Sequence, residues 1–392
     1  MTRIAFLDRL PWDYRVDTPV HRPLGGSQSA LCYLARALAA LGHEVRMVTM
    51  TTSPGRIEGV DCLSAGQGGF GLFRGAEVAV VLNDPDPEVA RALRAEIGPD
   101  GLLVLWTQHD VDQPAIAAFA SAEVRALFDR VVFVSDWQRQ AYRRSFGAGP
   151  EDIVLGNAIA PAFQQLFGEE ESVAGAKSGP PTLIYTSTPF RGLDVLLDAF
   201  PLIRSRLPEA RLLVHSSLGV YQVAEAQDGY RDLYARCRAL AGVEYRGAVS
   251  QPELAAALKG AHCLAYPSTF AETFCTAALE ALSAGCLAVV GDLGALAETT
   301  RGLAELVPLA SSPGDYAEAF AERVVRGLAA PDLFSRLDRQ RRLLAETATW
   351  PVRARAWSLW LEATLGLEAT LGHEATLGHE AAPAGQRLGY RQ

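Results

Sequence analysis

Short apolar runs and apolar residues at helical spacing follow one another along the first part of the chain. Residues 3–7 and 44–49 form apolar runs of strand length, which predicts two buried strands. Between them, leucines recur every three or four residues from Leu31 until Gly42, which predicts a helix with Ser27 as its N-cap. The order of strand, loop, helix and strand is typical of a Rossmann-like unit.

The same alternation continues to the middle of the chain. Four further apolar runs, separated mostly by apolar helical segments, predict strands at Glu77–Leu82, Leu102–Thr107, Val131–Val134 and Ile153–Leu155. Strands that alternate with helices predict a parallel sheet covered by helices on both faces. We therefore predict a first α/β domain over residues 1–165.

The periodic pattern is lost over residues 164–181, which are rich in Gln, Glu, Ser, Gly, Lys and Pro. This loss indicates an interdomain linker. The alternation then returns, with predicted strands at Thr182–Thr186, Arg211–His215, Val243–Tyr245, His262–Tyr266 and Leu287–Asp292. A second α/β domain is therefore predicted over residues 180–348.

The end of the chain has two further patterns. Residues 349–362 carry Pro351 in the first turn of a predicted helix and three tryptophans, which give this helix a large apolar surface to bury. Residues 363–392 contain near-identical six-residue units, each with a glycine, so a stable helix is not expected there. We interpret them as a low-complexity repeat tail.

Composition and charge narrow the class of protein. The chain has 392 residues, of which 49% are apolar and 21% charged, as expected for a globular protein of two ordinary domains. The net charge of −9 argues against a nucleic-acid partner. The apolar stretches are shorter than the ~18 residues of a membrane span, and the first is too short for a signal peptide. Six scattered cysteines suit free thiols in a reducing compartment, so we predict a cytoplasmic protein.

Candidate chemistry is concentrated in residues 268–285. Glu272 and Glu280 are separated by seven residues, in a loop that runs into an Ala/Leu-rich helix. A fully helical interval would place their Cα atoms roughly 12 Å apart, near the span from a sugar ring to a ribose across a pyrophosphate. The N–H groups of Thr273 and Phe274 would then lie at the helix start, where the dipole favours phosphate. This arrangement indicates a nucleotide-sugar site, and a solvated acidic face is the alternative.

The stretch Glu272-Thr-Phe-Cys275, followed by a small-residue helix and Glu280, resembles the E-x7-E motif of the family 4 retaining glycosyltransferases of the GT-B fold. The resemblance covers about residues 1–362. It implies two Rossmann-like parallel-sheet domains that face each other across a cleft. It also implies that the helix over residues 349–362 crosses back and packs on the first domain.

The resemblance assigns residues of this stretch to the sugar donor. Glu272 would hold sugar hydroxyls and Glu280 the ribose hydroxyls, while Thr273, Phe274 and Cys275 would line the donor. Glu280 lies in an apolar run, where an acidic side chain would otherwise face a core. This position favours the functional interpretation over a solvated face.

Two glycines of the first domain resemble another motif of this family. Gly25 and Gly26 precede the first helix, which ends in the turn Leu41-Gly-His-Glu-Val45. A glycine backbone can approach a phosphate or an acceptor closely. Both glycines are therefore assigned to the donor site, and a flexible turn is the alternative.

The resemblance also implies a cation that grips the donor diphosphate. Arg191 stands in this place, in the polar turn Ser187–Gly192, which we expect to be exposed, and it could contact phosphate oxygens in a bidentate way. A surface cation is the alternative. The second cation usual in the family is missing, because Tyr185-Thr-Ser-Thr188 is neutral. Arg246 and Gly247 belong to a family-like turn after a strand and are assigned to the nucleotide end of the donor.

His109 directly follows the predicted strand 102–107, at the carboxyl end where open α/β sheets bind ligands. Some family members carry a histidine there, near the transferred sugar. We predict that His109 orients this sugar, and a structural histidine is the alternative.

Three other patterns are rejected as sites. Gly66–Gly71 matches G-x-G-x-x-G, but the next predicted strand begins too soon for the helix that a dinucleotide fingerprint requires. Asp84–Asp86 and Asp110–Asp112 match a D-x-D metal pair, which is common by chance. A protein that resembles this family needs no metal for the diphosphate, so no metal or other cofactor is expected.

We predict an enzyme that transfers a sugar from a nucleotide diphosphate sugar to a hydroxyl of a carbohydrate, lipid-linked or small-molecule acceptor, with retention of anomeric configuration. No residue suits a covalent nucleophile, and the resemblance implies the family mechanism, in which the leaving diphosphate assists deprotonation of the acceptor on the same face; His109, Glu272 and Arg191 would surround it. The basic amphipathic segment after Ser135 could make a peripheral contact with anionic lipid at the inner face of the membrane. The alternatives are a GT-B nucleotide-sugar epimerase and a non-catalytic sugar-nucleotide binding protein.

Overall fold

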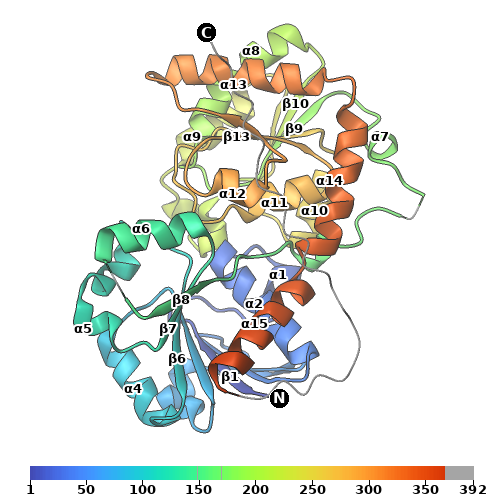
Figure 1. Ribbon diagram of the computed structural model, residues 1–392. Helices are drawn as coiled ribbons and strands as arrows, with labels where there is room; N and C mark the ends of the chain where they lie inside the picture. The colour runs from blue at the N-terminus through green and yellow to red at the C-terminus, as the bar shows by residue number, and fades with distance from the viewer. Residues whose placement is uncertain (148, 169, 367–392) are drawn as a thin grey trace, which may run out of the picture.

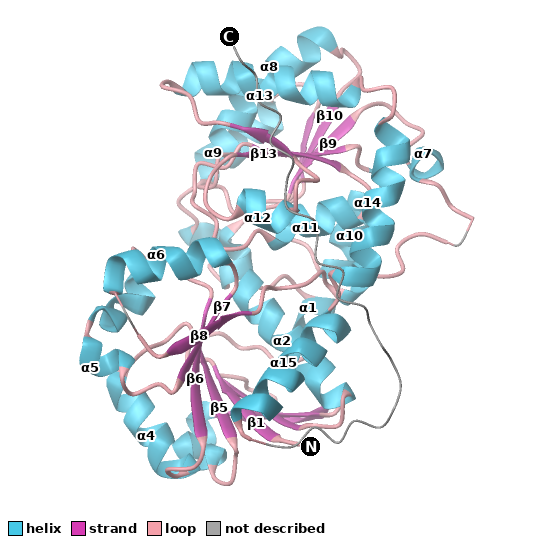
Figure 2. Cartoon of the chain, viewed as in Figure 1, coloured by secondary structure: helices cyan, strands magenta, loops and turns pink. Residues whose placement is uncertain are grey.

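The computed structural model describes residues 1–147, 149–168 and 170–366. Two α/β domains lie one above the other in Figure 1, and helices cover both faces of each sheet in Figure 2. The predicted repeat tail lies outside the described residues from position 367 onward. The apolar runs of the sequence form the strands, because parallel strands covered on both faces must be apolar throughout.

The first sheet has eight strands within the described residues, in the order β3-β4-β2-β1-β5-β6-β7-β8. All neighbours are parallel except β3 and β4, which form an antiparallel edge pair. The strands are β1 (Arg3–Leu7), β2 (Glu44–Thr49), β3 (Gly55–Ile57), β4 (Val60–Ser64), β5 (Val78–Leu82), β6 (Leu102–Thr107), β7 (Arg130–Phe133) and β8 (Glu151–Val154). Sequence patterning missed β3 and β4 because this edge pair is half-exposed and has no continuous apolar run.

Six α-helices of the described chain accompany this sheet. They are α1 (Thr18–His21), α2 (Gly26–Ala40), α3 (Ala65–Gly68), α4 (Pro87–Ile97), α5 (Ala122–Arg125) and α6 (Asp136–Phe146). The N-cap of α2 is Gly25, and the helix therefore starts before the predicted cap, Ser27. Ser135 caps α6, because its hydroxyl accepts the N–H of Gln138 at 3.0 Å.

The second sheet has six parallel strands within the described residues, in the order β11-β10-β9-β12-β13-β14. These are β9 (Thr182–Tyr185), β10 (Arg211–Val214), β11 (Val243–Tyr245), β12 (Cys263–Tyr266), β13 (Leu287–Gly291) and β14 (Glu305–Val307). The helices are α7 (Val173–Ala176), α8 (Leu193–Arg206), α9 (Arg231–Ala239), α10 (Gln251–Gly260), α11 (Thr276–Ser283), α12 (Leu296–Thr300), α13 (Pro313–Leu328) and α14 (Leu333–Thr347).

The last described helix, α15 (Trp350–Thr364), returns to the first domain and lies beside α2 (Figure 1). Trp357 of α15 meets Trp106 of β6 edge-on, with ring centroids 5.3 Å apart. His43 adds a polar link: its Nδ1 accepts the N–H of Thr2, and its Nε2 lies 2.8 Å from the Ser358 hydroxyl. The expected architecture of two Rossmann-like domains with a crossover helix is confirmed.

Two further expectations concern the chain as a whole. No helix among the described residues is both long enough and apolar enough to cross a membrane. All six cysteines are buried and unbridged, as their scattered spacing predicted.

Candidate functional site

A cavity of about 520 Å³ lies between the two domains, with lining residues from both. Nine of the predicted site residues line it: Gly25, Gly26, His109, Arg191, Glu272, Thr273, Phe274, Cys275 and Glu280. Arg246 and Gly247 lie outside the lining, whereas the next two residues, Ala248 and Val249, belong to it. The Arg246 side chain is half-exposed and pairs with Glu244 at 2.7 Å.

Arg191 and Glu272 form an ion pair in this cavity. Nη1 of Arg191 lies 2.7 and 2.8 Å from the two carboxylate oxygens of Glu272, and the hydroxyl of Tyr266 donates to the same carboxylate. The guanidinium also stacks over the ring of Phe270, 4.4 Å from its centroid. Glu272 is 3% exposed and the Arg191 side chain 21%. The expectation of an exposed arginine was wrong, because the side chain folds back onto the buried carboxylate.

Two glycines position this pair. Gly192 has φ of +97°, and a Cβ there would lie 2.0 Å from the carbonyl oxygen of Pro267, so the turn that carries Arg191 can pack closely only with glycine. Gly294 has φ of +66°, and a Cβ there would lie 2.5 Å from the backbone nitrogen and oxygen of Glu272. The Glu272 backbone is therefore held against Gly294, with which it forms an isolated bridge.

The helix after Glu272 begins later than expected. Its first residue is Thr276 and its N-cap is Cys275, so half of the interval between Glu272 and Glu280 is loop. Thr273 and Phe274 therefore do not stand at the helix start. The bridge to Gly294 keeps this segment extended, and the Thr273 hydroxyl donates to the carbonyl of Gln108 in the first domain at 2.6 Å.

Two helix N-termini face the cavity without a side-chain cap. The Cys275 side chain makes no capping hydrogen bond to α11, and Thr276 and Ala277 line the cavity. Gly25 has no side chain that could cap α2, and Gly26 has open space where a Cβ would be. Unpaired N–H groups at a helix start favour an anion. Among the described residues, Arg191 is the only lysine or arginine in the lining, so these helix starts supply the other positive potential.

Glu280 lies on α11, lines the cavity and is 3% exposed. One carboxylate oxygen accepts the N–H of Ala160 at 3.2 Å. Burial raises the pKa of Glu280 to about 8, which leaves the carboxyl largely protonated at neutral pH. A carboxyl held in this way can both donate to and accept from a pair of hydroxyls.

His109 stands where β6 ends, and its backbone carbonyl accepts the side-chain amide of Gln138 at 2.8 Å. Burial, aided by the charge of Arg191, lowers the pKa of His109 to about 4, so the ring is neutral. Its Nδ1 is buried and has no hydrogen-bond partner within the described residues. The neutral ring can therefore bind a sugar hydroxyl.

His215 was not among the predicted site residues. It follows β10 and lines the cavity, and neither of its ring nitrogens has a partner within the described chain. Burial and the nearby Arg246 lower its pKa to about 4. The Oε1 atom of Gln251, also in the lining, is likewise unpartnered among described residues. The carboxyl end of a predicted strand is the sequence signal that could have identified His215.

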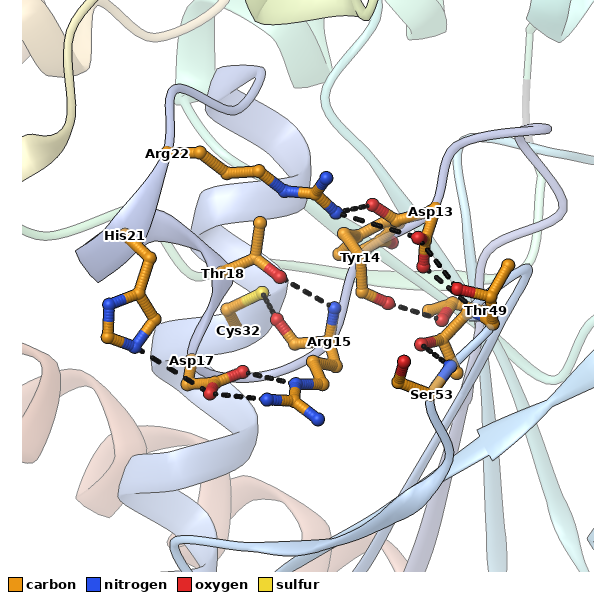
Figure 3. A network of polar contacts seen from close by, with 12 residues as sticks. Asp13, Tyr14, Arg15, Asp17, Thr18, His21, Arg22, Cys32, Thr49 and Ser53 are labelled. Carbon is orange, nitrogen blue, oxygen red and sulfur yellow. Dashed lines mark hydrogen bonds and ion pairs between the residues drawn. The ribbon is translucent and has the colours of Figure 1, made fainter.

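An aromatic pair closes the cavity across the two domains. Trp12 and Tyr221 stack with centroids 5.7 Å apart, and both line the cavity. Figure 3 shows a polar network around Asp13 and Tyr14, which follow Trp12 in the chain. In this network the carbonyl of Tyr14 accepts from the Thr49 hydroxyl at 2.8 Å. Asp13 also accepts from the Thr52 hydroxyl at 2.9 Å. No sequence pattern marked this pair, because Trp12 lies in a loop of the first domain and Tyr221 at the end of the 3-10 segment Leu218–Tyr221 of the second.

One of the two rejected metal pairs, Asp84 and Asp86, is engaged by an arginine. Arg9 lies 2.6 Å from Asp84 and 2.9 Å from Asp86. Within the described residues, no group of three or more His, Cys, Asp or Glu side chains is arranged to hold a metal ion. The basic segment of α6 is partly neutralised, since Arg139 pairs with Asp136 and Arg143 with Asp152.

Comparisons with known proteins agree with this architecture. Residues 180–330 match the family described as glycosyl transferases group 1. The phosphatidyl-myo-inositol mannosyltransferase of Mycobacterium tuberculosis is 30% identical over 139 residues, which are 35% of this chain and 34% of that protein. The match thus spans about a third of the length of this curated relative.

Solved structures show the same fold over nearly the whole chain. Sucrose-phosphate synthase from Thermosynechococcus elongatus has a TM-score of 0.69 at 18% identity, over 93% of this chain and all of that chain. HepE of Anabaena, solved in complex with UDP and glucose, has a TM-score of 0.65 at 12% identity, over the same shares. The protein therefore has the GT-B fold, and residues 180–330 of its second domain are similar to the glycosyl transferases group 1 family.

Proposed function

We propose that this protein transfers a sugar from a nucleotide diphosphate sugar to an acceptor hydroxyl. The observation that carries the proposal is the buried Arg191–Glu272 pair, which lies in an interdomain cavity lined by the uncapped starts of α2 and α11. The match of residues 180–330 to the glycosyl transferases group 1 supports it. So does the fold shared with HepE, which was solved with UDP and glucose.

The proposed roles follow from the contacts. Arg191 and the N–H groups of the two helix starts bind the diphosphate and stabilise the charge that develops on it. Glu272, oriented by Arg191 and Tyr266, binds sugar hydroxyls, and Glu280 binds the ribose hydroxyls. The neutral ring of His109 orients the transferred sugar.

We also propose retention of anomeric configuration. The support for retention is the resemblance of the stretch from Glu272 to Glu280 to the E-x7-E motif of retaining glycosyltransferases. Glu272 is engaged by Arg191, and Glu280 is largely protonated at neutral pH, so neither carboxylate suits a covalent nucleophile and a glycosyl-enzyme intermediate is not proposed. In the proposed step, the acceptor oxygen attacks the anomeric carbon from the face that the diphosphate leaves. The bond to the phosphate oxygen breaks, and the acceptor proton passes to that oxygen. We further propose that no metal or other cofactor takes part and that the enzyme works in the cytoplasm.

The test is turnover of a panel of UDP-, GDP- and ADP-sugars, with and without an extract of acceptors, in buffer with excess EDTA. The proposal expects acceptor-dependent release of nucleoside diphosphate, and an NMR coupling constant of the product that shows the donor's anomeric configuration. Turnover without acceptor to an epimer or free sugar would instead establish the epimerase. Donor binding without turnover would indicate a non-catalytic sugar-nucleotide binding protein. Loss of activity in EDTA that is restored by magnesium would refute metal independence.

A further inference from the structure

A second cavity, of about 620 Å³, lies entirely in the first domain. It opens where β1, β2 and β5 end, and α3 and the 3-10 segment Gly69–Phe73 border it. Most of its lining is apolar, including Leu10, Val48, Met50, Phe70, Phe73 and Leu82. Leu10 and Met50 are each 38% exposed, so part of the apolar surface of this cavity is open to solvent. The composition suits an apolar group.

The second cavity adjoins the first. Leu10 and His109 line both of them. A molecule in the second cavity would therefore reach the residue to which the proposed function assigns the transferred sugar. This contact places the second cavity on the acceptor's side of the reaction.

Asn83 supplies an unpaired polar group to the same cavity. It follows β5 with φ of +58° and is 7% exposed. Its Oδ1 accepts the N–H of Gln108 at 2.6 Å, so its Nδ2 is the free end of the amide, and this nitrogen has no partner in the described part of the chain. Buried donors are rarely left unpaired. A ligand oxygen would complete the hydrogen bonding of this side chain.

We propose that the acceptor is an amphiphile. Its apolar group, an alkyl chain or an aromatic ring, occupies the second cavity, one of its oxygens accepts from Asn83, and its reacting hydroxyl lies beside His109. The inference rests on the proposed function and specifies its acceptor class. The binding measurements below do not require turnover, so a failure of this inference can be told from a failure of the proposed function.

The chain offers a matched pair of variants. Ala115 and Ala117 are both exposed alanines of the 3-10 segment Pro114–Ala120, but only Ala115 belongs to the cavity lining. Ala115→Trp should therefore block the cavity, and Ala117→Trp should not. Asn83→Asp keeps an acceptor for Gln108 and a residue that tolerates positive φ, but it removes the side-chain donor.

The experiment is calorimetric titration with methyl, butyl, hexyl and octyl β-D-glucoside below their micelle concentrations. Burial of each methylene should tighten binding roughly fourfold, so octyl should bind on the order of 100-fold more tightly than butyl. Ala115→Trp should weaken octyl binding at least about tenfold, as should Asn83→Asp. Binding of nucleoside diphosphate to the interdomain cavity should stay unchanged in all variants, and the melting temperature should stay unchanged in the two tryptophan variants.

A chain-length series without any gain in affinity would overturn the proposal. An equal loss of octyl glucoside affinity in Ala115→Trp and Ala117→Trp would also overturn it, because the effect would then not come from blocking the cavity. Sedimentation with phosphatidylglycerol vesicles identifies the source of the apolar group. If the acceptor is a membrane lipid, the protein should sediment with the vesicles, and Ala115→Trp should abolish this binding. If the acceptor is a free amphiphile, the protein should stay in the supernatant.

Discussion

Replacement of Arg191 by alanine should reduce both stability and turnover, for separable reasons. The change leaves the carboxylate of Glu272, which is 3% exposed, with the Tyr266 hydroxyl as its remaining side-chain partner among the described residues. Breaking a buried ion pair in this way costs about 3–5 kcal/mol. For a domain of this size, that loss corresponds to a fall in Tm of roughly 6–20 °C.

A double variant separates the two roles of Arg191. In Arg191→Ala/Glu272→Gln no buried charge is left unpaired, so more than half of the lost Tm should return. Turnover should not return, because the cation for the diphosphate is still missing. If Arg191 contacts the diphosphate mainly in the transition state, where negative charge develops on the leaving group, its loss should lower kcat more than it raises the donor KM. Arg191→Lys should be more active than Arg191→Ala, since lysine keeps the positive charge but lacks the planar guanidinium that binds two phosphate oxygens at once.

Calorimetric melting curves and steady-state kinetics provide the measurement. Arg246→Ala is the matched control, because Arg246 is half-exposed, pairs with Glu244 and lies outside the cavity lining. Its Tm and turnover should stay close to those of the wild type. A wild-type Tm for Arg191→Ala, or a double variant no more stable than the single one, would refute the reasoning from the buried pair.

Three further changes test other parts of the structure. Burial raises the pKa of Glu280 from 4.5 to about 8, so the folded chain keeps a proton that the unfolded chain loses, and this residue lowers the free energy of unfolding by about 1.4 kcal/mol per pH unit between these values. The lowered pKa values of His109 and His215 act in the opposite direction below pH 6.5, so the contribution of Glu280 is read from the difference between wild type and Glu280→Gln. In urea titrations at pH 5 to 8 the wild type should lose stability relative to Glu280→Gln as the pH rises, and the same pH dependence in both proteins would contradict the assignment. The Glu298 carboxylate accepts two backbone N–H groups of α6 across the domains, at 2.7 and 2.9 Å. Glu298→Ala should therefore let the two domains move apart, which X-ray scattering would show as a larger radius of gyration and steady-state kinetics as a higher donor KM. Trp357→Ala should cost about 3–5 kcal/mol in denaturant unfolding, because it removes the fully buried ring that meets Trp106.

The sequence by itself determined most of the strands, their alternation with helices and hence the fold class; the short, half-buried β14 was not among the predicted strands. β6, for example, is buried at all six positions, and its apolar residues mark it without any knowledge of its neighbours. The burial of Glu280 also followed from its position in an apolar run. The half-exposed edge pair of β3 and β4 was missed, because its pattern does not differ from that of a loop.

Only the tertiary structure decided what the site residues do with one another. Arg191 and Glu272 are 81 residues apart, and their pairing depends on the close approach that Gly192 makes to Pro267 and Gly294 to Glu272. The same contact at Gly294 delays the start of α11 until Thr276. Periodicity reports only the local period and burial of a segment. Which charged groups meet, and which helix ends and loops enclose a cavity, is decided by packing between segments that are distant in the chain.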